Sequence, residues 1–397
     1  MSRPTQARWF NSTVLGIGMA SLFSDLSHET VTSVMPTLLA SMGAAAGALG
    51  TIEAVSDGLS SVAKLYGGWW TDRLQRRKPL CATGYGAMAA ATAVIASATS
   101  WPLVLAGRSI AWFARGIRTP ARKALLAEAV TTETYGRAFG FERSMDTLGA
   151  VLAPLAVMGL LRIGLTQTRV LWFSVLPPFV AAAAIIFLVH ETKKRTPALH
   201  PLVRGLRGLP GTLTPFLRAV GTFGAGDFAH SLMILYATAA LTPAHGTASA
   251  AATAVGLYAV HNVCYAGISY PAGILADRMN KWLVLGFGYS CGVATALLLA
   301  LNVSTVPWLL LAFILGGIYV GIEETLEDSL AAELLPVSQR GTGFGALASI
   351  NGIGDFVSSL SIGWLWSAYG ANVGFGFAAA VMAIGTFLTL RGRWHRL

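Results

Sequence analysis

Two short stretches of this chain carry acid and histidine side chains at a spacing that suits proton or metal chemistry. Asp25 and His28 lie in the stretch SDLSHE, with Glu29 directly after them. Asp227 and His230 repeat the D-x-x-H spacing 202 positions later. Residues three apart share one face of a helix. Each stretch is therefore predicted to present one carboxylate and one imidazole on a single stripe.

Buried acid and histidine side chains have two chemical uses and one structural use. Burial raises the pKa of a carboxylate and lowers that of a histidine, which brings both toward neutral pH and favours proton exchange. The same oxygen and nitrogen atoms bind divalent transition metals, so Asp25, His28, Asp227 and His230 are also an alternative metal site. In the structural interpretation, each pair only fixes its helix to a neighbour. We favour protons as the coupling ion, expect no cofactor, and keep a divalent metal as the alternative substrate.

Both stretches lie inside long apolar segments, which identify the class of protein. Hydrophobic residues make up 54% of the 397 residues and charged residues only 12%, whereas a soluble domain has about 25% charged residues. Apolar runs of roughly 20 residues are long enough to cross a bilayer as helices. The sequence predicts an all-α membrane protein with spans at 12–40, 47–71, 79–98, 102–124, 137–163, 168–190, 214–241, 248–275, 282–301, 306–331, 341–368 and 371–392.

The distribution of basic residues predicts the orientation of these spans. Lys and Arg gather in alternate connections, near 3–8, 73–78, 193–207, 278–281, 340 and 391–396. Such loops face the cytoplasm, so both termini are predicted to be cytoplasmic. The net charge of +10 then reflects topology and contact with the lipid bilayer, and it does not predict nucleic-acid binding. No cleavable signal peptide is evident, and a multi-pass protein of the inner (plasma) membrane is expected.

The chain contains an internal repeat. Three pairs of stretches match at the same offset of 205 positions: GGWWTDR, ending at Arg73, with AGILADR, ending at Arg278; RGIRTPARKALLAE with VGIEETLEDSLAAE; and FGFERSMDTLG with FGALASINGIG. A Lys-, Arg-, Pro- and Gly-rich segment separates the copies. We therefore predict an N-terminal six-helix bundle at 1–190, a cytoplasmic linker at 191–213 and a C-terminal six-helix bundle at 214–397.

With this repeat, the sequence resembles the major facilitator superfamily (MFS). The best local marker is GGWWTDRLQRRK, which is similar to the loop signature between the second and third helices of that family, although Gln75 replaces its internal glycine. The resemblance implies two pseudo-symmetric bundles around a central site near the bilayer midplane, with transport by alternating access. It also implies a cytoplasmic brace made of Gly68, Asp72, Arg73, Arg76 and Arg77, with a degenerate second copy at Asp277 and Arg278.

A second marker concerns the direction of transport. Gly140, Gly149, Ala153 and Pro154 are similar to the glycine–proline spacing of antiporters in this superfamily, which implies export. Small residues allow close helix contact, and the proline bends the helix. Ordinary helix packing is the alternative explanation. The fourth-helix signature departs from the family, because Trp112 stands where its arginine belongs.

Further polar residues in the predicted spans extend the candidate site. They are expected to contact substrate or to carry protons, or to form structural pairs such as the one between Arg143 and Asp146, three residues apart. Besides that pair, they are Glu53 and Asp57 in the second span, His261 and Asn262 in the eighth, and Asn351 and Asp355 in the eleventh.

Equivalent positions in the two copies of the repeat carry opposite charges. The basic positions of the fourth span align with acidic positions of the tenth at the same offset of 205. We predict an intracellular gate, with a solvated helix end as the alternative, formed by Arg118, Arg122, Lys123, Glu323, Glu327 and Asp328.

No motif indicates an enzyme. His28 and Glu29 begin an H-E-x-x-H pattern, but Thr32 occupies the position of the second histidine, and the chain has no P-loop. The sequence therefore predicts a monomeric secondary transporter that exports a small molecule with proton coupling. The alternative is transport of a divalent metal ion or metal complex, since metal-exporting relatives of this fold use acid and histidine side chains in the same helices.

Overall fold

The computed structural model describes residues 9–43, 46–191 and 201–391, and the regular structure in these ranges is helical throughout. The chain divides into two compact units. The N-terminal unit comprises residues 1–209 together with 335–349, and the C-terminal unit comprises residues 210–334 and 350–397. The bundle boundaries predicted from the sequence stay a prediction.

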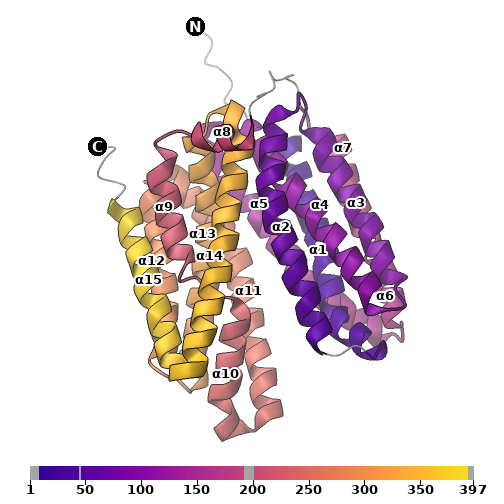
Figure 1. Cartoon of the computed structure of the whole chain (residues 1–397), viewed down its shortest axis with the longest axis vertical. Coiled ribbons are helices and arrows are strands. Elements are labelled where there is room, and N and C mark those ends of the chain that lie inside the picture. The colour runs from indigo at the N-terminus through magenta and orange to yellow at the C-terminus, as the bar shows by residue number, and fades with distance from the viewer. Residues whose placement is uncertain (1–8, 44–45, 192–200, 392–397) are drawn as a thin grey trace. The chain divides into compact units, whose positions relative to one another are not determined.

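The N-terminal unit is a bundle of long helices that run alongside one another (Figure 1). Helix α1 packs on α5 and α7, and α4 packs on α2 and α3. The unit contains α1 (Ser12–Ser41), α2 (Ala46–Arg73), α3 (Lys78–Ala96), α4 (Trp101–Glu128), η1 (Thr132–Thr134), α5 (Tyr135–Arg162), α6 (Gln167–Phe173), α7 (Leu176–Leu188) and α8 (Leu202–Arg207).

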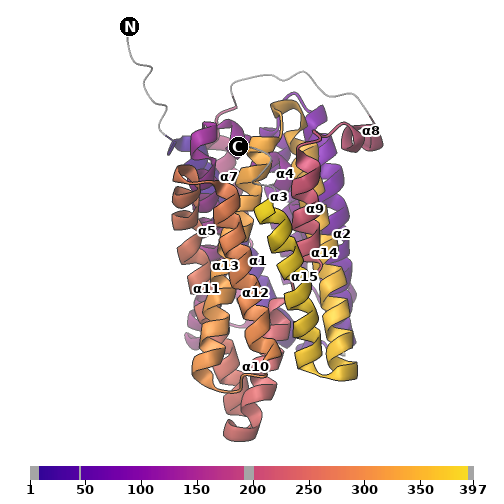
Figure 2. The same ribbon diagram turned by 90° about the vertical axis from the view of Figure 1, so that its left-hand side faces the viewer.

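The C-terminal unit repeats the same helix pairings. Helix α11 contacts α13, α12 contacts α13 and α15, and α9 contacts α15; Figure 2 shows the helices of this unit. These pairs correspond to α2–α4, α3–α4, α3–α7 and α1–α7 of the N-terminal unit. Helix α14 contributes residues to both units, with the division after Ser349. η2 (Val337–Gln339) belongs to the N-terminal unit. The remaining elements are α9 (Leu213–Gly224), α10 (His230–His245), α11 (Thr247–Arg278), α12 (Lys281–Ala300), α13 (Val306–Leu334), α14 (Arg340–Tyr369) and α15 (Ala371–Arg391).

Two predicted spans are each interrupted. The span predicted at 168–190 consists of α6 and α7. Pro177 and Pro178 lie in the first turn of α7, where their missing N–H groups are tolerated. The span predicted at 214–241 consists of α9 and α10, separated by residues 225–229. Each of these two spans therefore consists of two helices, because proline lies beside one break and glycine lies beside the other.

Seven helical stretches of the described chain are long and apolar enough to cross a bilayer. The other five predicted spans coincide with α1, α2, α4, α14 and the α9–α10 pair, which are interrupted or carry more polar and charged residues. The seven are Lys78–Ala96, Thr132–Arg162, Gln167–Leu188, Ser249–Arg278, Lys281–Ala300, Val306–Leu334 and Ala371–Arg391.

Gly149 of α5 allows α1 and α5 to approach closely, and its replacement should destabilise the N-terminal unit. A Cβ atom at Gly149 would lie 2.4 Å from the carbonyl oxygen of Leu22 and 2.9 Å from the backbone nitrogen of Leu26. Backbone atoms cannot rotate away, so we expect Gly149→Ala to lower the free energy of unfolding by about 1–3 kcal/mol. Gly159→Ala is the matched control on the same helix, since a Cβ there meets nothing within 4 Å. Thermal unfolding of both purified variants tests this, and equal stability of the two would contradict it.

Candidate transport site

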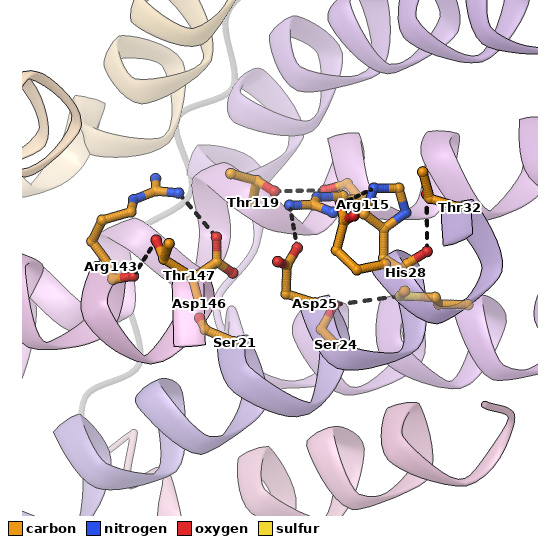
Figure 3. A network of polar contacts seen from close by, with 12 residues as sticks. Ser21, Ser24, Asp25, His28, Thr32, Arg115, Thr119, Arg143, Asp146 and Thr147 are labelled. Atoms are coloured by element: carbon orange, nitrogen blue, oxygen red, sulfur yellow. Dashed lines mark hydrogen bonds and ion pairs between the residues drawn. The ribbon is translucent and has the colours of Figure 1, made fainter. Parts of the chain in front are cut away.

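A row of buried polar side chains lies on one face of α1. Ser21, Ser24, Asp25 and His28 are 0%, 2%, 6% and 9% exposed, and their spacing of three or four residues places them on neighbouring turns. An Asp25 carboxylate oxygen lies 3.2 Å from an Arg115 guanidinium nitrogen on α4, and Figure 3 shows the two side chains reaching toward each other. Asp25 is therefore an ion-pair partner of α4.

His28 lies between an arginine and a tryptophan of α4. Its Nδ1 atom is 3.0 Å from a guanidinium nitrogen of Arg108, and its ring is 4.0 Å from the ring of Trp112. Arginine only donates hydrogen bonds, so Nδ1 of His28 accepts one and the ring proton lies on Nε2. That Nε2 atom is 3.3 Å from a carboxylate oxygen of Glu29. This contact pattern requires an unprotonated Nδ1, so a doubly protonated His28 would lose the Arg108 contact.

Two further arginines of α4 contact side chains of other helices in the N-terminal unit. Arg118 donates to Ser24 at 2.6 Å and lies over the Tyr85 ring at 3.9 Å. Arg122 forms an ion pair with Glu142 of α5 at 2.8 Å and donates to Ser21. The two guanidinium groups therefore connect α4 to α1, α3 and α5.

Asp146 of α5 extends this cluster. It pairs with Arg143 at 2.9 Å and lies 3.9 Å from Arg122, and Figure 3 shows Arg143 and Asp146 facing each other. The contact between Arg143 and Asp146 agrees with their spacing in the sequence. Whether the pair also contacts substrate stays a prediction.

The second helix contributes one described polar contact to this region. Asp57 accepts a hydrogen bond of 2.6 Å from the indole nitrogen of Trp112. The tryptophan therefore contacts Asp57 through its nitrogen and His28 through its ring face. Glu53 lies on α2, but its side chain is outside the described residues.

The predicted brace residues lie at the end of α2 and in the connection to α3. Asp72 accepts the backbone N–H groups of Gly341 and Thr342 at 2.8 and 2.6 Å, and it pairs with Arg77 at 3.0 Å. It thereby binds the amino end of α14, which carries partial positive charge. Gly68 permits this approach, because a Cβ there would lie 2.3 Å from the Gly341 carbonyl oxygen.

The other predicted brace residues make fewer described contacts. The guanidinium of Arg73 lies 4.2 Å from the centre of the Trp69 ring, and Arg76 is exposed. In the degenerate copy at the end of α11, Asp277 is half-buried and Arg278 is exposed.

Sequence analysis missed two acids that bind the Arg77 segment. Glu128 pairs with the Arg77 guanidinium, and Glu191 accepts the backbone N–H groups of Arg77 and Lys78 at 2.8 and 3.0 Å. It also missed the paired role of Arg115. Arg108, Arg115, Arg118 and Arg122 share one face of α4 by spacing, and this signal was available in the sequence.

The C-terminal unit holds a cavity of about 230 Å³ beside the break between α9 and α10. Asp227 lies in that break, at 225–229, and His230 is the first residue of α10. The prediction that these two residues share a helical stripe is therefore wrong for this copy, because the helix is interrupted between them. The cavity is lined by Gly224, Asp227, Phe228, Ala229, His230, Val320, Glu323, Glu324, Asn351 and Asp355.

Hydroxyl and amide groups donate hydrogen bonds to acids in this cavity and beside it. Tyr319 donates to the carboxylate of Asp227, and Tyr265 donates to that of Glu324. Glu327 accepts from Tyr289 at 2.5 Å and from Asn351 at 2.7 Å. The polar side chains of α13 and α14 therefore form a second cluster, which is rich in carboxylates. The cluster of α1, α4 and α5 in the N-terminal unit is instead rich in guanidinium groups.

Histidine side chains group near this cavity. The rings of His230 and His261 are 4.6 Å apart, and His261 stacks on Tyr258 at 5.6 Å. Nδ1 of His261 lies 3.4 Å from the side-chain oxygen of Asn262. The structure thus brings His230, His261 and Asn262 together, as part of the predicted site within this unit.

The predicted gate and metal site are not assembled within either unit. Arg118 and Arg122 are buried among side chains of the N-terminal unit, and Lys123 is half-buried. In the C-terminal unit Glu323, Glu327 and Asp328 are 8%, 2% and 3% exposed. Among the described residues, no group of three or more His, Cys, Asp or Glu side chains is placed to hold a metal ion. Gate and metal site both stay predictions.

Long helices, an internal repeat of helix pairings and buried ionisable side chains define a polytopic helical membrane protein. The sequence model of the Major Facilitator Superfamily matches residues 17–224 and again residues 218–395, so the chain belongs to this superfamily. It is thus a membrane transporter of a superfamily of carriers that are generally not enzymes.

Comparison with individual proteins agrees with this membership. An uncharacterised MFS-type transporter of Methanocaldococcus jannaschii is 25% identical over 360 residues, covering 90% of this chain and 89% of its own. A bacterial homologue of the iron transporter ferroportin, in an outward-facing state, has a TM-score of 0.78 at 12% identity, over 96% of this chain and 99% of its own. The Escherichia coli fucose:proton symporter has a TM-score of 0.72 at 17% identity, over 96% and 98%. At these identities the two structures show the fold alone.

Proposed function

We propose that this protein is a proton-coupled secondary transporter that exports a small molecule across the inner membrane by alternating access. The observation that carries the proposal is the ion pair between Asp25 of α1 and Arg115 of α4, with a distance of 3.2 Å and Asp25 only 6% exposed. Ionisable side chains inside membrane segments are energetically costly and mark ion and proton pathways. A proton that binds Asp25 removes its charge and thereby releases Arg115.

His28 supports a proton-linked change in the same cluster. Its Nδ1 atom accepts from Arg108, so a second proton on the ring would oppose that contact. Asp25 and His28 therefore both contact arginines of α4 in a way that depends on their protonation. Proton binding and release would change how α1 is held against α4.

Export, orientation and oligomeric state are further parts of the proposal. Gly140, Gly149, Ala153 and Pro154 of α5 match the antiporter spacing in part, and Gly149 does lie at the close approach to α1. Lys and Arg gather in alternate connections, which favours twelve spans with both termini in the cytoplasm. We expect a monomer, because each compact unit packs its own helices.

The contacts of the N-terminal unit favour protons over a divalent metal ion. Arg108 and Arg115 lie directly against His28 and Asp25. Two guanidinium groups at these distances repel a divalent cation and compete for the same carboxylate and nitrogen atoms. The metal alternative is retained as an outcome of the following experiment.

Proton coupling is tested in proteoliposomes that contain a pH-sensitive dye. A panel of an organic cation (benzylammonium), an organic anion (benzoate), fucose and Mn²⁺ is added in turn to wild-type protein. We expect one organic compound to trigger proton movement in the direction opposite to its own. Proton movement triggered by Mn²⁺ alone would favour the metal alternative, whereas flux of a compound that ignores both an imposed pH gradient and the membrane potential would contradict proton coupling.

A further inference from the structure

The cavity of the C-terminal unit has the properties of a binding site for a small organic cation. Four of its lining residues are carboxylates, namely Asp227, Glu323, Glu324 and Asp355. The lining also includes the apolar side chains of Phe228 and Val320. A site that combines anionic and apolar groups suits a ligand that carries both a positive charge and a hydrocarbon part.

Glu323 is the residue that indicates a ligand. It is 8% exposed and lines the cavity, and it makes no hydrogen bond or ion pair with any residue that the structure describes. Burial of a carboxylate without a partner is unfavourable, so its charge calls for a cation or a proton. The repeat places Arg118 at the equivalent position of the N-terminal unit, but that side chain donates to Ser24 and lies over Tyr85.

Asp227 adds a second negative charge at the same cavity. Its described side-chain partner is the hydroxyl group of Tyr319, which is neutral. It lies three residues beyond the carboxyl end of α9, whose last residue, Gly224, also lines the cavity. The helix dipole favours a positive charge at that end. Three independent features therefore attract a cation to one place: Glu323, Asp227 and the end of α9.

The size and lining of the cavity distinguish an organic cation from a metal ion. A volume of about 230 Å³ is large for a bare ion and small compared with drug-binding pockets of roughly 300–1,000 Å³. Phe228 is 3% exposed and lines the cavity, so it offers an aromatic surface to a bound cation. We propose that this cavity binds a small organic ammonium ion, with Glu323 as its counter-ion. The proposal deepens the proposed function, since it names the substrate class.

Calorimetric titration of the purified full-length protein tests this proposal. The probe is benzylammonium, and the matched ligands are benzyl alcohol, which is neutral, and benzoate, which is an anion. We expect the wild type to bind benzylammonium at least tenfold more tightly than either matched ligand. Glu323→Gln should reduce that affinity by about tenfold or more, while Glu323→Asp, which keeps the charge, should retain most of it.

Glu333→Gln is the matched control, because Glu333 pairs with Lys281 at 3.0 Å and does not line the cavity. Thermal unfolding of each variant shows whether it is folded. If Glu323→Gln is not, the tenfold preference of the wild type for benzylammonium over benzyl alcohol carries the test. Equal affinity for benzyl alcohol and benzylammonium, unchanged binding in Glu323→Gln, or tight stoichiometric binding of Mn²⁺ that excludes benzylammonium would overturn the proposal.

The outcomes also separate this inference from the proposed function. If benzylammonium does not bind but fucose or benzoate moves against protons in proteoliposomes, the cation site is wrong and the proton-coupled transporter stands. If benzylammonium binds through Glu323 but no panel compound moves with or against protons, the site stands and proton-coupled transport of these compounds is wrong.

Discussion

Replacing Asp25 with asparagine should abolish proton-driven accumulation while leaving exchange of the same compound intact. Asparagine keeps the shape of the side chain and an acceptor oxygen for Arg115, which lies 3.2 Å from Asp25. It cannot bind and release a proton. A pH difference of one unit is a tenfold ratio of proton concentrations, which corresponds to about 1.4 kcal/mol per coupled proton. This free energy can sustain about tenfold accumulation of the transported compound. We therefore expect an accumulation ratio near one in Asp25→Asn.

The measurement compares uphill uptake with exchange in proteoliposomes, using the panel compound that gives the largest proton signal in the wild type. Glu133→Gln is the control, since it also removes one carboxylate but at an exposed position in η1. Undiminished accumulation by Asp25→Asn would remove Asp25 from the coupling pathway. Loss of exchange together with a lower melting temperature would indicate that the Asp25–Arg115 pair is structural.

Sequence patterns predicted the helices well, because long apolar segments need only their own composition to be recognised. They did not predict the breaks at 174–175 and 225–229, which interrupt two of the predicted spans. A local signal marks both interruptions: a Pro-Pro pair lies just after the first, and a Gly-Ala-Gly stretch lies at the start of the second. The two spans were predicted from their apolar composition alone. Proline and glycine weaken a helix, and that signal was not weighed.

The two D-x-x-H stretches show what a repeat can and cannot predict. The match between Asp25–His28 and Asp227–His230 suggested equivalent environments. In the structure Asp25 faces Arg115 from α4, whereas Asp227 lies in a helix break and accepts from Tyr319 of α13. These partners are about 90 positions away in each case. Spacing along one helix fixes which residues share a face, but it does not identify the helix that packs against that face.

The basic row on α4 shows the same limit. Its match with acidic positions of α13 predicted attraction at a gate, and that prediction is untested. The structure adds partners that the alignment of the two copies could not show: Ser24 and Tyr85 for Arg118, and Glu142 for Arg122. Burial explains why, since a guanidinium at 2% or 7% exposure needs partners close at hand.

Breaking the buried pair between Arg122 and Glu142 should destabilise the N-terminal unit more than Gly149→Ala or Asp25→Asn does. The pair connects α4 to α5 at 2.8 Å, and Ser21 of α1 donates to the same carboxylate at 2.5 Å. Glu142 is 1% exposed and Arg122 is 7% exposed. Removal of one partner from a buried ion pair costs about 3–5 kcal/mol, because the other charge is left uncompensated. We expect a loss of this size in Arg122→Met.

A double-mutant cycle tests whether the two charges act together. Cys81 is fully buried in the same unit, so in a background with Cys264 and Cys291 replaced by alanine a thiol-reactive dye reports thermal unfolding of Arg122→Met, Glu142→Gln and the double variant. We expect the double variant to lose less stability than the sum of the single losses, since no uncompensated charge remains. Arg162→Met, at the exposed end of α5, is the control and should change stability by less than about 0.5 kcal/mol. If the loss of stability in the double variant equals the sum of the losses in the two single variants, Arg122 and Glu142 stabilise the bundle independently, through separate neighbours.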